Sequence, residues 1–211
     1  MDGQQPECLA PVRARLQDLV DRAKTPGIQY IAVDATRVIC ACAAGLADIR
    51  AQKPMDVATT MMAYSMSKTI TAVAVLQLVE RGLIALDAPV TRYLPESPYG
   101  DRVTVADLMA HTGGLPNPIP LRWVHPFAEH GAFDEHQAFS AVLLANPRLS
   151  REPGARYAYS NIGYWMLGAI VERVAAMAFT SYVTTRVLEP LGLGAGELGY
   201  TVSDPGRHAT G

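Results

Sequence analysis

The sequence lacks a strong excess of charge of either sign. Its 211 residues include 18 lysines and arginines against 20 aspartates and glutamates, a formal net charge of -2. Nucleic acids and anionic membranes are bound by strongly basic surfaces, so this balance argues against both as partners. We therefore expect a small-molecule substrate and no nucleic acid.

Long apolar runs are also missing. No stretch of 18 apolar residues occurs, which is about the length that a membrane-spanning helix needs, so no membrane span is predicted. Residues 1–7 are polar and acidic, where a secretory signal would be basic and then apolar. The sequence predicts a cytoplasmic protein, or a periplasmic or secreted one if a leader has been removed.

Cysteine is scarce, with three residues in the chain: Cys8, Cys40 and Cys42. Three cysteines cannot make a fully paired disulfide framework, and the single C-x-C pair has no second pair to complete a zinc site. We expect Cys40 and Cys42 to be small buried side chains on one face of a strand.

Metal and cofactor motifs are absent as well. The spacing of His125, His130 and His136 matches no zinc motif, and no glycine-rich nucleotide loop or G-x-S-x-G elbow occurs. We predict no metal and no cofactor, and expect these histidines on a solvated lid. Residues 126–146 are expected to form a variable lid or insertion.

Apolar residues make up 49% of the chain and charged residues 18%, which is typical of a globular protein. Residues 28–33 and 38–46 are predicted to form a β-hairpin with a turn at 34–37, although a hairpin alone makes a poor sheet. Helical spacing predicts the remaining elements: 9–23, 67–81 closed by Gly82, 105–110 stopping at Gly113-Gly114, 136–145, 162–179 and 182–188. The apolar face of the helix at 67–81 is expected to include Ile70, Val73, Ala74, Leu76 and Leu78.

The first chemical signal is Ser65-Met66-Ser67-Lys68. Side chains three residues apart share one face of a helix, so the Ser65 hydroxyl and the Lys68 amine can form a hydrogen bond. A serine at a helix N-terminus gains alkoxide character, and a partly desolvated lysine can accept its proton near neutral pH. Alternatively, Ser65 caps the helix and Lys68 is solvated.

Two further segments follow in order: Leu108-Met109-Ala110-His111-Thr112-Gly113-Gly114-Leu115-Pro116 and Tyr159-Ser160-Asn161. Tyr159 offers a phenol that can shuttle a proton, and Asn161 an amide that can bind a carbonyl. Together with S-x-x-K, they resemble the serine β-lactamase and penicillin-binding-protein superfamily, in the branch of class C β-lactamases, DD-peptidases and β-lactamase-like esterases.

The resemblance implies a role for each residue. Ser65 is the nucleophile and Lys68 its activating partner. Tyr159 is the general base and acid, and Asn161 contacts the substrate or Lys68. His111 is expected to be a structural hydrogen-bonding residue behind the site. Of the tryptophans, Trp165 is expected in the core, and Trp123 is a candidate contact for an acyl group.

The implied fold is α/β of the β-lactamase type, an antiparallel sheet flanked by helices plus a mostly helical region. One β-lactamase-related domain is expected over residues 1–211, with about 1–58 and 180–211 in the α/β part and about 60–165 in the helical region. The chain ends before the family's third motif, K-T-G or H-x-G, which supplies an oxyanion-hole donor. We therefore expect an incomplete sheet, and either a homo-oligomer or a missing C-terminal segment.

The implied function is a serine hydrolase that forms an acyl-enzyme at Ser65 and acts on an ester, a β-lactam or a D-amino-acid amide. The expected cytoplasmic location favours an esterase. The alternative is a non-catalytic penicillin-recognition protein or an inactive fragment, which the absent third motif favours and the intact Ser65, Lys68, Tyr159 and Asn161 oppose.

Overall fold

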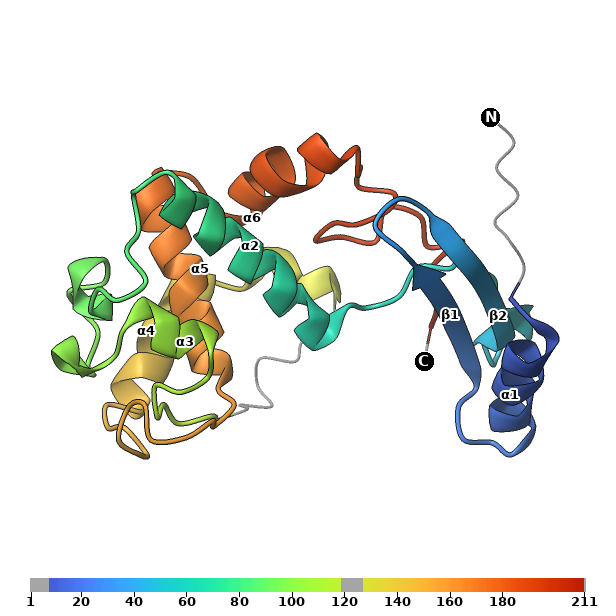
Figure 1. Cartoon of the computed structure of the whole chain (residues 1–211), viewed down its shortest axis with the longest axis horizontal. Helices are drawn as coiled ribbons and strands as arrows, with labels where there is room; N and C mark the ends of the chain where they lie inside the picture. Colours follow the sequence, from blue (N-terminus) through green and yellow to red (C-terminus); the bar gives the residue numbers. More distant parts are fainter. Residues whose placement is uncertain (1–7, 119–126, 211) are drawn as a thin grey trace. The chain divides into compact units, whose positions relative to one another are not determined.

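The computed structural model describes residues 8–118 and 127–210. They form two compact units (Figure 1). One comprises the chain up to Ala63 together with the part from Gly194 onward, and the other is Tyr64–Leu193. The segment 180–193, expected in the α/β part, thus lies in the helical unit. Its π-helical turn at Val183–Leu188 packs against a long helix there, α2 (Ser67–Glu80).

The first unit is built on the predicted hairpin. Strand β1 (Gly27–Val33) pairs antiparallel with β2 (Val38–Asp48), and the Asp34 carboxylate closes the turn by accepting the N–H groups of Thr36 and Arg37 at 2.8 and 3.0 Å. A third strand, β3 (Lys53–Pro54), adds to β2 in the order β1-β2-β3. No strand is predicted between the hairpin and residue 67, because two residues are too few to show the alternation by which strands are recognised.

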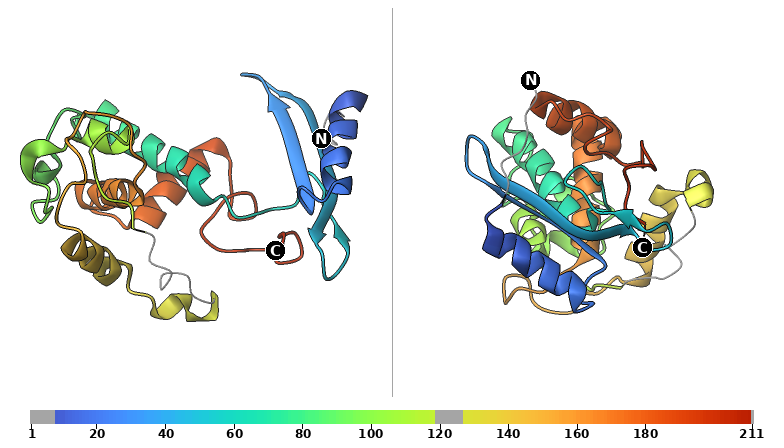
Figure 2. Two further views of the ribbon diagram at one scale, coloured as in Figure 1. Left: turned by 90° about the horizontal axis from the view of Figure 1, so that it is seen from below. Right: turned by 90° about the vertical axis from the view of Figure 1, so that its right-hand side faces the viewer.

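Helix α1 (Ala10–Asp21) packs on β2, as Figure 2 shows. Leu16 is buried there, beside Ile28 and Ala44. Thr210 N–H donates to the Ala47 carbonyl of β2 at 2.9 Å, so the far end of the chain returns to this sheet.

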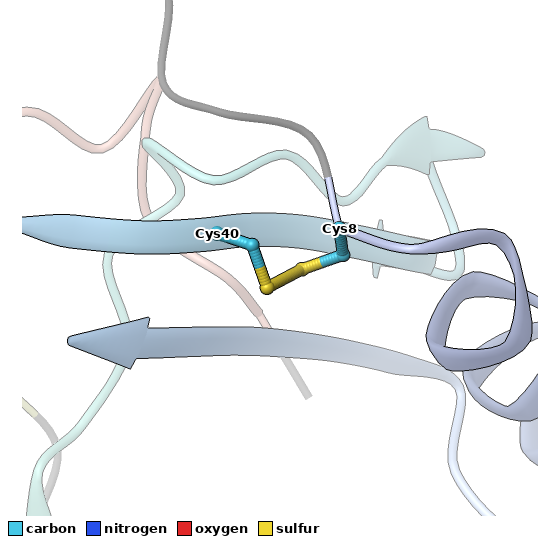
Figure 3. Close-up of a disulfide and its surroundings, with 2 residues drawn as sticks. All are labelled: Cys8 and Cys40. Carbon is cyan, nitrogen blue, oxygen red and sulfur yellow. A yellow bond between two sulfur atoms is a disulfide. The ribbon is translucent and has the colours of Figure 1, made fainter.

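The expectation that Cys40 is simply a small buried side chain on a strand is wrong. Cys40 forms a disulfide with Cys8, which lies two residues before α1 (Figure 3). The two cysteines are 32 residues apart and meet because α1 packs on β2. Nothing in their spacing signals that contact. Cys42, the third cysteine, is free and buried as expected.

The second unit is helical and is centred on α2 and α5 (Asn161–Ala175), which pack side by side (Figure 1). Buried residues of α2, at Thr71, Ala74, Val75 and Leu78, recur at helical spacing. Val73 and Leu76 lie outside this stripe and are 37% and 45% exposed, so placing them on the buried face was wrong.

Shorter helices surround this pair. They are α3 (Val105–Met109), α4 (Glu135–Ala145) and α6 (Phe179–Tyr182). Short 3-10 helices lie at Tyr64–Met66, Val90–Arg92, Gly100–Arg102, Phe127–Ala132 and Glu189–Leu191. Thr104 and Asp107 cap α3 reciprocally, which confirms the predicted helix start.

Several helix ends differ from the predictions. The helix expected over 162–179 ends at Ala175, because Ala176 adopts a left-handed conformation with φ of 49°. The segment expected to be a helix at 182–188 is a π-helical turn that follows α6. α3 ends at Met109, and the left-handed residue after it is His111, with φ of 57°, before the expected stop at Gly113-Gly114.

Within 8–118 and 127–210, no single helix is long and apolar enough to cross a membrane. One pair of consecutive helices, α5 and Phe179–Leu191, passes that test jointly on length and composition, but the two are bent by 76°. Much of α5 is buried in the helical unit, including Met166, Leu167 and Ile170.

Candidate active site

Ser65 lies in the 3-10 turn Tyr64–Met66, directly before α2. Met66 occupies the N-cap position of α2 and makes no side-chain cap. Ser65 is therefore not the helix cap, and its exposed hydroxyl is free to meet other groups. The positive end of the α2 dipole lies beside it and favours negative charge at this oxygen.

Lys68 is half-buried and points back toward Ser65. Its Nζ donates to Asn161 Oδ1 at 2.9 Å and to Ser65 Oγ at 3.4 Å. The ammonium also lies 5.0 Å from the centre of the Tyr159 ring and 5.7 Å from that of Tyr164, within the range of cation–π attraction. Lys68 is thus not the solvated lysine of the alternative interpretation.

Tyr159 completes the group from the segment that leads into α5. Its hydroxyl is 2.8 Å from Ser65 Oγ and 3.2 Å from Asn161 Oδ1. Burial raises the pKa of this phenol, but hydrogen bonds with Lys68 and Ser65 and the Lys68 charge outweigh burial, so the pKa lies below that of free tyrosine. The Tyr159 phenolate therefore forms at a lower pH than that of free tyrosine in water.

His111 supports this segment from behind. Its Nδ1 accepts the Ser160 N–H at 3.2 Å, and its carbonyl accepts the Ala158 N–H at 2.7 Å. The imidazole ring lies 4.5 Å from the Tyr159 ring. Burial, and then the Lys68 charge, lower the pKa of His111, which favours the neutral imidazole that Nδ1 needs in order to accept the Ser160 N–H. These contacts agree with the structural role expected for His111.

The structure therefore brings Ser65, Lys68, Tyr159 and Asn161 into one hydrogen-bonded group. Of the two contacts expected for Asn161, the one to Lys68 is present. Their catalytic roles stay predictions. Sequence reasoning missed two neighbours, Tyr164 and Asn117. Tyr164 stands one helical turn after Asn161, a spacing that could have signalled its place.

Asn117 carries no such signal, because it follows Pro116 in an irregular loop. Its Oδ1 accepts the backbone N–H of Asn161 at 2.9 Å and the side-chain Nδ2–H at 3.1 Å. A second loop contact runs beside it, where Ser160 Oγ donates to the Pro116 carbonyl at 2.7 Å. The loop is thereby attached to the N-terminus of α5.

The other singled-out residues lie elsewhere. Trp123 and His125 fall outside the described residues, as does the side chain of His130. His136 is exposed, and Trp165 is half-buried against Phe139 at 5.3 Å between ring centres. Over 8–118 and 127–210, no group of three or more His, Cys, Asp or Glu side chains is arranged to hold a metal ion.

This arrangement can perform nucleophilic chemistry. An exposed hydroxyl touches a phenol of lowered pKa, and a lysine charge contacts both. A nucleophile in hydrogen-bond contact with a base, and a base oriented by a third group, is the general pattern of an activated serine.

Comparison with known proteins finds relatives along most of this chain. Esterase EstB of Burkholderia gladioli is 34% identical over 218 residues, covering 95% of this chain and 54% of EstB. Penicillin-binding protein 4* of Bacillus subtilis is 30% identical, over 71% of this chain and 33% of that protein. The chain thus spans about half of the first relative and a third of the second.

Among solved structures, EstCE1, a hydrolase with promiscuous acyltransferase activity, superposes with a TM-score of 0.75 at 28% identity. The match covers 94% of this chain and 55% of EstCE1. The predicted β-lactamase/transpeptidase-like fold is confirmed. The family model described as Beta-lactamase matches residues 12–211, so the chain belongs to the β-lactamase family.

Proposed function

We propose that this chain carries the nucleophile and the base of a serine hydrolase that cleaves esters through an acyl-enzyme at Ser65. The observation that carries the proposal is the 2.8 Å contact between Ser65 Oγ and the Tyr159 hydroxyl, with Lys68 Nζ 3.4 Å from the same serine oxygen. Two hydroxyl oxygens at this distance form a hydrogen bond, along which a proton can pass without an intervening water.

In the first half-reaction, the Tyr159 phenolate takes the Ser65 proton as Oγ attacks the ester carbonyl carbon. The carbonyl π electrons move to oxygen and form a tetrahedral intermediate. Its collapse breaks the bond to the alkoxy group, and Tyr159 returns the proton to the leaving alcohol. Ser65 then carries the acyl group as an ester, with Tyr159 again a phenolate.

In the second half-reaction, Tyr159 takes a proton from water while the water oxygen attacks the acyl carbon. Collapse of this intermediate breaks the Ser65 ester, and the proton passes to Oγ. The carboxylic acid leaves and ionises in solution. The positive charge of Lys68 stabilises the Tyr159 phenolate between these steps.

Esters are favoured over the other expected substrates by similarity. EstB is named an esterase, and EstCE1 a hydrolase with acyltransferase activity. Both alignments include nearly all of this chain. β-Lactams and D-amino-acid amides present an acyl carbon to the same nucleophile, so they are tested beside the ester.

Intact-mass measurement tests the proposal. The chain is incubated with a fluorophosphonate, and in parallel with p-nitrophenyl butyrate, a cephalosporin and D-phenylalanine amide, beside Ser65→Ala. We expect one fluorophosphonate adduct that requires Ser65, and ester turnover faster than β-lactam or amide turnover. Ser67→Ala is a matched control, because Ser67 stands two residues away and its side chain takes no part in the Ser65 contacts.

Two outcomes would contradict the proposal in different ways. No adduct on a folded chain would remove the activated serine and favour a protein that binds without turnover. A Ser65-dependent adduct with faster β-lactam or amide turnover would retain the serine hydrolase and overturn the ester.

A further inference from the structure

The Asn161 side chain has four hydrogen-bonding positions, and three of them are occupied by described residues. Its Oδ1 accepts from Lys68 Nζ at 2.9 Å and from the Tyr159 hydroxyl at 3.2 Å. Its Nδ2 donates one hydrogen to Asn117 Oδ1 at 3.1 Å. The second Nδ2 hydrogen has no partner among the residues of 8–118 and 127–210.

The orientation of this amide follows from two groups that can only donate. The Lys68 ammonium has no lone pair, so the Asn161 atom facing it must be the oxygen. The backbone N–H of Asn161 likewise only donates, so the Asn117 atom facing it at 2.9 Å must be Oδ1. Asn117 therefore presents an acceptor to the Asn161 side chain, which suits Nδ2 and repels Oδ1.

We propose that Asn117 is a positioning residue of this site, whose Oδ1 holds the Asn161 amide with its oxygen on Lys68 and leaves one Nδ2 hydrogen for a substrate carbonyl. This inference rests on the proposed function, which supplies the reaction and the substrate carbonyl. Without this acceptor, the Asn161 amide can rotate about its terminal torsion, which is broad and roughly two-fold. Rotation would turn an NH₂ group toward the Lys68 ammonium.

A simpler role for Asn117 is to cap α5. The first N–H groups of a helix have no partner within it, and Asn117 accepts that of Asn161. Capping stabilises the helix but requires only the backbone contact, whereas positioning requires the Asn161 side chain. The two roles therefore separate when that side chain is removed.

A double-mutant cycle makes this separation. Asn117→Leu replaces the amide with an apolar group of similar size, and Asn161→Ala removes the side chain while keeping the backbone N–H. With Asn161 present, we expect Asn117→Leu to slow Ser65 labelling by the fluorophosphonate about tenfold, because the loss of one hydrogen bond changes a rate by about this factor. In the Asn161→Ala background, the same change should have no further effect on the rate, but should still lower the melting temperature.

Direct titration of Tyr159 by NMR, with its ring carbon labelled, gives a readout that needs no turnover. Asn117→Leu should raise the Tyr159 pKa, because a less firmly held Lys68 stabilises the phenolate less. The charge-assisted hydrogen bond from Lys68 lowers the Tyr159 pKa, whereas the neutral hydrogen bond from Tyr159 to Asn161 raises it. The charge-assisted bond is the stronger of the two, so its weakening decides the direction. The change should vanish in the Asn161→Ala background.

The labelling rate and the Tyr159 pKa together separate a failure of the positioning role from a failure of the proposed function. Equal effects of Asn117→Leu with and without the Asn161 side chain, in rate and in pKa, would leave Asn117 as a cap and overturn the inference. No change in either quantity with Asn161 present would overturn it as well. If the wild-type chain shows no Ser65 adduct, but its Tyr159 pKa responds to Asn117 only through Asn161, the positioning holds and the proposed function fails.

Discussion

Ser65 Oγ and the Tyr159 hydroxyl lie 2.8 Å apart, although 94 residues separate them in the chain. Each stands just before a long helix, Ser65 before α2 and Tyr159 before α5, and these helices pack together. Two helix N-termini therefore meet at one hydrogen bond. Their positive dipole ends both favour an anion there, whether serine alkoxide or tyrosine phenolate.

Removing the Tyr159 hydroxyl should slow acylation without unfolding the helical unit. Tyr159→Phe keeps the ring that lies against His111 and loses the proton acceptor, which is worth about 10²- to 10⁴-fold in rate. The rate constant of fluorophosphonate labelling measures the effect. Tyr157→Phe, on an exposed ring of the same segment, should label like wild type.

Combining Tyr159→Phe with Lys68→Ala should cost far less than the product of the separate losses, because the two residues act as one unit. A full product would mean that Lys68 and Tyr159 work independently. A normal rate for Tyr159→Phe alone would remove Tyr159 as the base.

The pH dependence of labelling should report the lowered pKa of Tyr159. The phenolate is the base, so the rate rises with pH and levels off above an apparent pKa lower than 10. Lys68→Met removes a hydrogen bond and a positive charge but leaves the burial that raises the pKa, so its profile should move to higher pH. Lys24→Met, on an exposed lysine after α1, is the control. Superimposable profiles for Lys68→Met and wild type would mean that Lys68 does not tune the base.

The predictable part of the site is the local part. Ser65 and Lys68 are three residues apart at a helix start, so helical geometry alone places them together. Tyr159 and Asn161 were placed by resemblance to a family, because no local pattern links them to Ser65. Asn117 was missed, because its contact depends on where an irregular loop meets α5.

The fold shows the same division. The hairpin and long helices follow from apolar periodicity. In contrast, the end of α5 depends on a left-handed alanine, Ala176, a residue type that gives no C-cap signal. The Cys8–Cys40 disulfide depends on the packing of α1 on β2. The number and spacing of the three cysteines give no sign of that packing.

The disulfide should stabilise the first unit. It closes a loop of 32 residues, for which the chain-entropy model gives about 3–4 kcal/mol. Cys8→Ser and Cys40→Ser should each lower the free energy of unfolding by about that amount, and the double variant by little more. Urea denaturation measures this, with Asp2→Ser in the N-terminal segment as a control.

Thiol counting under denaturing conditions checks the bond itself. One thiol, that of Cys42, should react before reduction and three after it. Three before reduction, in protein isolated with thiols blocked, would contradict the disulfide. One thiol in protein from its native cells would favour a periplasmic or secreted location over the cytoplasm, where disulfides are rare.

His111 should make stability depend on pH on the acid side. The pKa of His111 is lowered in the folded chain, so below about pH 6.5 the imidazole is protonated more fully in the unfolded chain than in the folded one. The free energy of unfolding therefore falls as the pH decreases. His111→Asn keeps an acceptor for the Ser160 N–H, tolerates the left-handed backbone and does not titrate.

We expect His111→Asn to reduce the proton uptake on unfolding between pH 8 and pH 5 by up to one proton, measured from urea midpoints across that range. His136→Asn is the matched control, because His136 is exposed at the start of α4, and its pH slope should follow wild type. An unchanged slope for His111→Asn would show that His111 titrates alike in both states. The Ser160 N–H would then not depend on a neutral imidazole, and the segment carrying Tyr159 and Asn161 would have to be held by its remaining contacts, Ser160 Oγ with Pro116 and Asn161 with Asn117.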